Sequence, residues 1–192
     1  YVERYHTRVF NTVADAFFVD SGLSYDGTNT SSTTLTLSGG TTYAHSQVLT
    51  LTASSSTFVS GDPGNTYTLT IGSETLVCTV QAYTSATVVT VKAGRDVPVA
   101  FRTVATAIWS KGVDAISGMG HLEGKTISIL ADGNVEAQKV VSSGAITISH
   151  PASKIHLGLP IQGDVQTLNL ELGQPTQQGK KKSISAVTLR VE

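Results

Sequence analysis

The chain has 192 residues, with 13 Lys and Arg against 14 Asp and Glu, and a single cysteine. The near-neutral charge argues against a nucleic-acid-binding protein, which needs clustered cations to displace counterions from phosphates. One cysteine excludes a disulfide framework and a cysteine-based zinc site. No apolar run approaches the ~20 residues that span a bilayer as a helix, so we expect no membrane anchor.

The sequence is rich in β-branched residues, with 27 threonines and 21 valines. Such side chains are stiff at χ1 and pack well on a pleated surface, which favours strands. In chain order, apolar and polar residues alternate with a period of two in Thr33–Leu37, Val48–Ala53, Thr66–Ile71, Thr75–Ala82, Thr126–Leu130, Ala145–Ile148 and Ser183–Val191. Turn-forming residues separate these segments at Gly39-Gly40, Asp62-Pro63-Gly64, Gly72-Ser73, Asp132-Gly133-Asn134 and Ser143-Gly144. The pattern predicts an all-β fold of roughly ten or more short strands.

One segment is ambiguous between helix and strand. Thr103–Lys111 is the best helix candidate, but Trp109 and its β-branched residues favour a strand. Lys154–Pro160 predicts a strand that ends at Pro160, because proline cannot donate to a ladder.

The distribution of charge predicts the domain organisation. Residues Thr28–Pro98 are dominated by Thr, Ser, Gly and Val, whereas the flanks carry most of the charge. A low-charge β segment between charged stretches is typical of a small domain inserted in a host loop, which costs little closure entropy when the loop ends lie close together. We expect a discontinuous β-sandwich or barrel-like host domain, residues 1–34 and 112–192, with a small inserted β-domain, residues 35–111. One continuous sandwich is the alternative.

Several glycines predict local backbone geometry. Gly124 and Gly133 lie where turns require positive φ or a close backbone approach. Residues 131–134, which include Asp132, predict a hairpin turn between Thr126–Leu130 and Val135–Val141. Gly118 and Gly120 flank Met119 near the expected junction of insert and host, where they are a candidate interdomain hinge.

Three parts of the sequence, in this order, resemble one protein family. They are Asp15–Gly27, preceded by Tyr1–Arg4, then Gly120–Asn134, then a third part made of Gly144–Ile148, Pro151–Pro160 and Asp164–Leu168. Together they resemble the tail tube or nozzle proteins of short-tailed bacteriophages, and Ser60–Ser110 is similar to a small β-insertion that some members carry. Because the chain starts and stops inside the longer chain of that family, we expect it to be a fragment.

The resemblance implies a virion structural protein that assembles into a ring through which DNA passes. It implies a location in the phage tail, after synthesis in the cytoplasm of the bacterial host. The family supplies no catalytic residue, metal or cofactor, and we expect none.

Two histidine groups are candidates for chemistry. His121 and Glu123 are two residues apart and would share a side of a strand, with Asp132 approaching through the hairpin. A metal site or an acid–base pair competes here with a structural pair; the missing His-Glu-x-x-His spacing favours the structural interpretation. His150 and His156 would lie roughly 20 Å apart on an extended chain, which disfavours a shared metal.

Other polar and apolar residues are expected to be structural. Asp15, Asp20 and Asp26 lack the alternating ligands of a calcium loop and are expected to be solvated turn carboxylates. Cys78 lies on an apolar strand face and is expected to be buried, as is Trp109.

The one cationic cluster of the sequence is Lys180, Lys181 and Lys182. A solvated loop is its default interpretation. The functional alternative is a contact to passing DNA or to an acidic neighbouring subunit, through charges that salt would screen.

Different classes of function stay open. The leading hypothesis is a tail component that acts by self-assembly with copies of itself and with other tail proteins, through a head-to-tail contact that closes into a ring. The alternative is a carbohydrate- or host-receptor-binding β module of a phage tail. A hydrolase would need an activity that is lost on mutating His121, Glu123 or Asp132.

Overall fold

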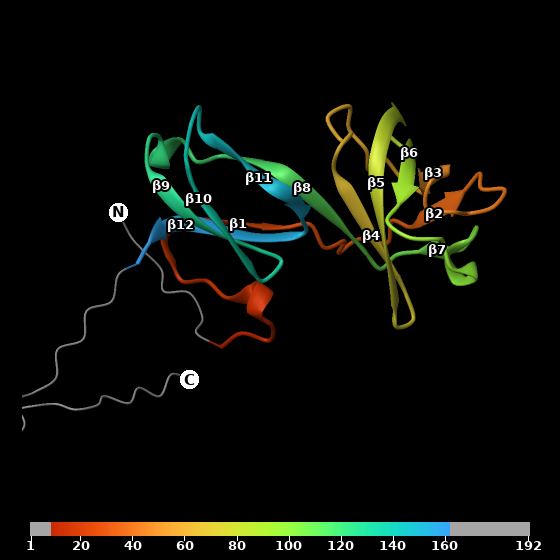
Figure 1. The fold of residues 1–192 in the computed structure, drawn as a ribbon, viewed down its shortest axis with the longest axis horizontal. Helices are drawn as coiled ribbons and strands as arrows, with labels where there is room; N and C mark the ends of the chain where they lie inside the picture. Colours follow the sequence, from red (N-terminus) through yellow and green to blue (C-terminus); the bar gives the residue numbers. More distant parts are fainter. Residues whose placement is uncertain (1–8, 162–192) are drawn as a thin grey trace, which may run out of the picture. The chain divides into compact units, whose positions relative to one another are not determined.

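The computed structural model describes residues 9–161, which form two antiparallel sheets, one of four strands and one of eight (Figure 1). The all-β prediction is confirmed. In chain order the elements are η1 (Val13–Asp15), β1 (Val19–Asp26), β2 (Leu35–Ser38), β3 (Val48–Ala53), β4 (Thr66–Ile71), β5 (Glu74–Ser85), β6 (Val88–Ala93), η2 (Val99–Phe101), β7 (Ala105–Thr106), β8 (Trp109–Ser117), η3 (Gly120–Leu122), β9 (Thr126–Ala131), β10 (Asn134–Val140), β11 (Ala145–Ala152) and β12 (Lys154–Pro160).

The eight-stranded sheet has the order β11-β8-β4-β5-β6-β3-β2-β7, and its last strand returns to β4. The Thr106 hydroxyl donates to the Thr70 carbonyl oxygen at 2.7 Å, and the Thr70 N–H donates to the Ile108 carbonyl oxygen at 2.9 Å. This barrel-like closure leaves little free edge at β7. The alternating apolar residues point inward and form a first core of Leu35, Leu37, Leu49, Leu51, Ala53, Phe58, Tyr67, Leu69, Leu76, Cys78, Val80, Val89, Val91, Ala93, Val97 and Phe101.

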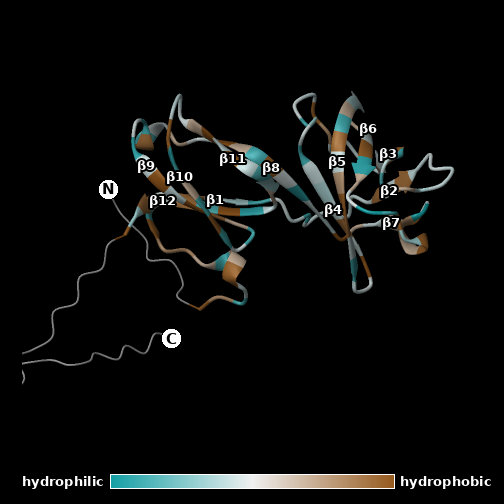
Figure 2. Ribbon diagram, viewed as in Figure 1, coloured by the Kyte–Doolittle hydropathy of each residue, from teal (hydrophilic) through white to brown (hydrophobic). Residues whose placement is uncertain are grey.

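The four-stranded sheet has the order β1-β12-β9-β10 and packs against the β8–β11 pair as a sandwich. Figure 2 shows hydrophobic segments gathered in these strands and hydrophilic ones in several of their turns. Between the two layers lies a second core of Ile116, Met119, Leu122, Ile127, Ile129, Ala131, Val141, Ile146, Ile148, Ala152, Ile155 and Leu157. The alternation of apolar and polar residues therefore gives each sheet one buried face and one solvated face.

Strand β8 lies beside both the first and the second core. Its first residues pair with β4, up to Thr66 opposite Gly112, and its last residues pair with β11, from Val113 to Ser117. The first core draws on residues 35–101 and the second on residues 116–157, yet residues 9–161 belong to one compact unit. The insertion of residues 35–111 into a host made of 1–34 and 112–192 therefore stays a prediction.

The expected tight turns are present. Asp132 and Gly133 have φ of 47° and 82°, and Ser143 and Gly144 have φ of 54° and 66°. Two consecutive positive φ values define the type I′ turn, whose twist matches that of the flanking antiparallel strands. Gly124 also has a positive φ, of 70°. The Asp132-Gly133 turn fixes the register of β9 with β10, and the Ser143-Gly144 turn is closed by an isolated bridge between Ser142 and Ala145.

The outer strands of both sheets carry irregularities. β1 is interrupted between Asp20 and Leu23, β10 between Glu136 and Lys139, and β11 in the stretch that contains Pro151. Bulges, charged residues and proline at an edge discourage pairing with the edge of another chain. Within residues 9–161, each sheet edge is therefore either irregular or closed.

Candidate functional site

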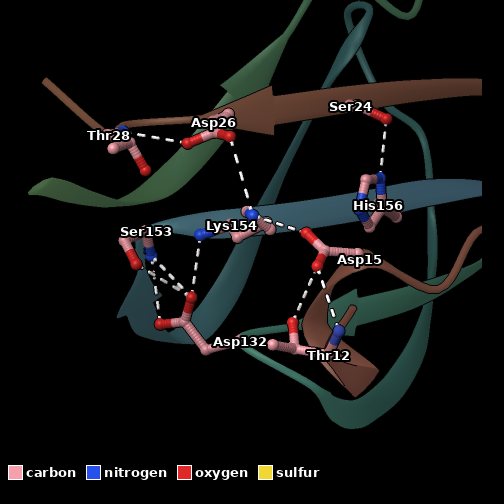
Figure 3. A network of polar contacts seen from close by, with 9 residues as sticks. All are labelled: Thr12, Asp15, Ser24, Asp26, Thr28, Asp132, Ser153, Lys154 and His156. Carbon is pink, nitrogen blue, oxygen red and sulfur yellow. Dashed lines mark hydrogen bonds and ion pairs between the residues drawn. The ribbon is translucent and has the colours of Figure 1, made fainter. Parts of the chain in front are cut away.

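Lys154, the first residue of β12, connects three segments (Figure 3). Its ammonium group donates to Asp15 Oδ1 at 2.5 Å and lies 3.7 Å from Asp26 Oδ2. Asp15 ends η1 and Asp26 ends β1. All three side chains are partly exposed, so solvent screens each ion pair and its contribution to stability is small. We call these three residues the latch.

The latch shifts the pKa of each of its members. The hydrogen bond from Lys154 lowers the pKa of Asp15, with a further contribution from Thr12. The hydrogen bond from Thr28 lowers the pKa of Asp26, and the charge of Lys154 acts in the same direction. The hydrogen bond to Asp15 raises the pKa of Lys154. The latch is therefore fully charged near neutral pH.

Asp132 binds the backbone at the start of the same strand, β12. Its carboxylate accepts hydrogen bonds from the Ser153 N–H and the Ser153 hydroxyl, at 3.1 and 3.0 Å, and from the Lys154 N–H at 2.8 Å (Figure 3). The β9–β10 turn is thereby tied to the connection between β11 and β12. Asp132 therefore links two turns through hydrogen bonds, a bracing role that differs from that of a metal ligand.

Replacing Asp132 with alanine is expected to lower the free energy of unfolding by about 1–3 kcal/mol, because the backbone donors lose their acceptor and alanine tolerates positive φ poorly. Asp132→Asn is the matched control, since asparagine keeps an acceptor oxygen and adopts positive φ readily. Urea unfolding of both variants checks this. Equal losses for alanine and asparagine would contradict the bracing role.

Next to the latch is a pocket of about 370 Å³. Its lining comes from the segment before β1, from β1 and from β12, and includes Val9, Phe10, Asn11, Asp15, Ser24, Tyr25, Asp26, Lys154 and His156. The lining combines carboxylate, amide, hydroxyl and imidazole groups with the apolar surfaces of Val9, Phe10 and Tyr25. It is the candidate binding site within residues 9–161.

Ser24 and His156 face each other inside this pocket. They are directly opposed in the β1–β12 ladder, and the Ser24 hydroxyl lies 2.6 Å from His156 Nδ1. The imidazole is 9% exposed and meets the Phe17 ring edge to face, with centroids 5.5 Å apart. A hydroxyl–imidazole contact can activate a nucleophile, but it also needs donors aimed at a developing oxyanion. Opposed residues of a ladder fit a cross-strand structural pair.

The expected placement of His121 and Glu123 on a strand was wrong. His121 lies on η3, and its Nε2 is 2.9 Å from the Ser21 carbonyl oxygen. Glu123 follows η3, and its carboxylate accepts from the N–H groups of Ser143 and Gly144, at 2.9 and 2.7 Å. The two side chains therefore have different partners, because a turn of 3₁₀-helix rotates successive residues apart. In residues 9–161, no three His, Cys, Asp or Glu side chains gather in a way that could hold a metal ion.

The remaining sequence candidates have mixed outcomes. Asp15 and Asp26 are solvent-accessible, as expected, but each is also paired with Lys154 in the latch, which was not predicted. Gly118 and Gly120 flank Met119, which is fully buried in the second core, and their role as a hinge stays a prediction. Lys180, Lys181 and Lys182 lie outside the described residues.

A second polar cluster lies where β4 pairs with β8. Asp62 is fully buried and accepts hydrogen bonds from Lys111 Nζ at 2.5 Å, the Val59 N–H at 3.0 Å and the Tyr67 hydroxyl at 3.1 Å. Burial by itself would raise the pKa of Asp62, but the hydrogen bonds from Lys111 and Val59 outweigh it and the pKa is lowered. The Lys111 carbonyl oxygen accepts from the Tyr25 hydroxyl at 3.0 Å. This cluster therefore ties a core strand to β1.

Two comparisons with known proteins were informative only in finding no similarity. A scan against protein-family models finds no match, and a search of curated proteins finds no similar sequence. Among residues 9–161, no helix has the length and apolar character needed to cross a membrane.

Proposed function

We propose that this chain is a structural component of a bacteriophage tail, a tail tube or nozzle subunit domain that acts by self-assembly. The observation that carries the proposal is the use made of the polar side chains in residues 9–161. Asp132 and Glu123 accept hydrogen bonds from backbone N–H groups, and Asp15, Asp26 and Asp62 are paired with lysines. These polar groups stabilise their own fold through internal hydrogen bonds and ion pairs, as we expect of a structural subunit.

The edges and faces of the sheets support the same proposal. The irregular outer strands discourage open-ended pairing through sheet edges. Faces and loops are then the surfaces through which copies meet, and a head-to-tail contact between them closes into a ring when its rotation allows. The proposed partners are copies of this chain and other tail proteins, with passing DNA contacted through Lys180–Lys182, and the proposed location is the virion tail.

The proposal also treats the chain as non-catalytic. Under it, Ser24 and His156 are structural, and so are His121, Glu123 and Asp132. The resemblance of Asp15–Gly27 and Gly120–Asn134 to tail tube or nozzle proteins supports this.

Localisation in purified particles tests the proposal. Antibodies raised against this chain, used for immunogold labelling of the phage that encodes it, are expected to decorate the tail. Cryo-microscopy of the same particles is expected to show the chain repeated around the tail axis. Labelling of the capsid alone, or absence of the chain from purified particles, would overturn the proposal.

The second candidate is a carbohydrate- or host-receptor-binding module, and the pocket beside the latch is what favours it. Asn11, Ser24 and His156 line the pocket with groups that commonly bind sugar hydroxyls. The carboxylates beside them already bind Lys154, Thr12 and Thr28, which leaves them less available to a ligand. Binding on a glycan array that is lost in Asn11→Ala and kept in Lys125→Met would favour this candidate over the structural one.

The isolated chain is expected to be monomeric or weakly associated, because ring contacts commonly need more than one domain of a subunit. Sedimentation velocity at micromolar concentration measures this. A stable hexamer would contradict the expectation and would place the ring contacts within these 192 residues.

A further inference from the structure

Strand β10 forms one edge of the four-stranded sheet, where it pairs with β9 along one side. None of its seven residues is buried, and among residues 9–161 no strand pairs with its other side. Val135 and Val140 on this strand are 84% and 60% exposed. Unpaired backbone groups beside exposed apolar side chains are a template for a further strand.

The register of β10 with β9 assigns its side chains to the two faces of the sheet. Glu136 and Lys139 are opposed to two isoleucines of the second core. Val135 and Val140 are opposed to β9 residues of the outward face. Because opposed residues of an antiparallel pair point to the same face, the two charged residues lie on the core side of this edge and the two valines on the solvent side.

The irregularity of β10 selects the kind of strand that can pair with it. Between Glu136 and Lys139 the strand has one residue more than the facing stretch of β9. Such a bulge, together with charges on the core side of an edge, disfavours a regular strand as a partner. A second β10 is the exception, because across a two-fold axis both strands carry the same extra residue at the same place.

We propose that β10 pairs antiparallel with β10 of a second copy of this chain, about a two-fold axis between Ala137 and Gln138. In this register Glu136 faces Lys139 of the second copy, and the symmetry forms this pair twice. The charges that disfavour other partners thus neutralise each other. Because each β10 has one free side, the contact stops at two chains and joins their four-stranded sheets into one. It adds to the proposed ring contact and does not depend on it.

The same register covers the exposed valines. Val135 faces Val140 of the second copy on the solvent side, and apolar pairs and opposite charges both stabilise neighbouring strands. Moving the axis onto Gln138 would set Glu136 against Val140 and lose both kinds of pair. One strand of seven residues is a small contact compared with a standard interface of roughly 1,600 Å², so the dimer is expected to be weak.

Sedimentation equilibrium of the full chain, from micromolar to millimolar concentration, tests the pairing. Glu136→Lys and Lys139→Glu are each expected to weaken self-association about tenfold, because like charges then face each other. An equimolar mixture of the two variants is expected to associate at least as well as wild type, because each cation then faces an anion. Lys92→Glu, a charge reversal at an exposed position of β6, is the control and is expected to change nothing. A wild type that stays monomeric at millimolar concentration, or association that both single reversals leave unchanged, would overturn the proposal.

Oxidative cross-linking tests the register independently. In a Val135→Cys, Val140→Cys variant, the opposed cysteines of two chains come close enough for a disulfide. Val135→Cys alone places its cysteine roughly 17 Å from the same position of the second copy, at ~3.4 Å per residue. The double variant is therefore expected to give at least tenfold more covalent dimer on a non-reducing gel. Burial raises the pKa of Cys78 to about 12, so it stays out of the bond. Equal cross-linking of the two variants would overturn the proposed register.

Discussion

Replacing Lys111 with methionine is expected to lower the free energy of unfolding by about 3 kcal/mol. The substitution leaves the Asp62 carboxylate, which has no exposed surface, without its cation. Removing one member of a buried pair is costly because the remaining charge keeps its desolvation penalty. Urea unfolding at neutral pH measures the loss, and the melting temperature is expected to fall by roughly 6–12 °C.

The Asp62→Asn, Lys111→Met double variant is the control for this loss. With both charges removed, it is expected to recover part of the stability, and the double-mutant cycle then gives the coupling between the two side chains. Because the pKa of Asp62 is lowered, its contribution is present above an ordinary value near 3.8 and is lost as the pH falls through the folded value. The difference in the free energy of unfolding between wild type and Lys111→Met should therefore become smaller in acid. A constant difference down to pH 2 would contradict this account.

Truncating Leu51 to alanine is expected to cost about 2–5 kcal/mol, because the side chain is fully buried in the first core and the cavity cannot collapse in a closed sheet. If residues 35–111 form an inserted domain, this loss falls on the first core alone. Tyr67 belongs to that core and the partly buried Trp109 packs against it, so tryptophan fluorescence follows its unfolding. Hydrogen exchange of the Ile129 amide reports the unfolding of the second core.

The matched variants separate one unfolding unit from two. Leu51→Met keeps the volume and is expected to cost less than about 1.5 kcal/mol. Ile129→Ala is expected to destabilise the second core by about 2–5 kcal/mol while the fluorescence transition stays in place. A single transition that moves equally for Leu51→Ala and Ile129→Ala would contradict the inserted-domain prediction and favour one cooperative unit.

Strand positions were predictable wherever the signal was local. Val48–Ala53 and Thr66–Ile71 coincide with β3 and β4, because their alternation of apolar and polar residues fits one buried face. The Asp132-Gly133 and Ser143-Gly144 turns were predictable because the required positive φ selects those residue types. The Thr103–Lys111 segment contains β7 and the start of β8, as its β-branched residues favoured.

The candidate site was much less predictable. Ser24 and His156 are 132 residues apart, and Asp15 and Lys154 are 139 apart. The sequence contained no motif at these spacings, and Asp15 and Asp26 resembled ordinary turn carboxylates. Strand β1 itself was not predicted from alternation, because its bulge after Asp20 breaks the period of two. The register of β1 with β12 places Ser24 opposite His156 and Asp26 opposite Lys154, and the position of η1 brings Asp15 to Lys154.

The sequence alone determined the all-β class, the turns and the inward faces of the strands, because each depends on the preferences of a few neighbouring residues. The tertiary structure decided which distant side chains share a polar environment: the latch, the Ser24–His156 pair and the buried Asp62–Lys111 pair. The physical reason is that such pairs form only after the registers between strands are set. Between strands far apart in the chain, such as β1 and β12, no tight turn sets the register, which depends instead on the packing of the core.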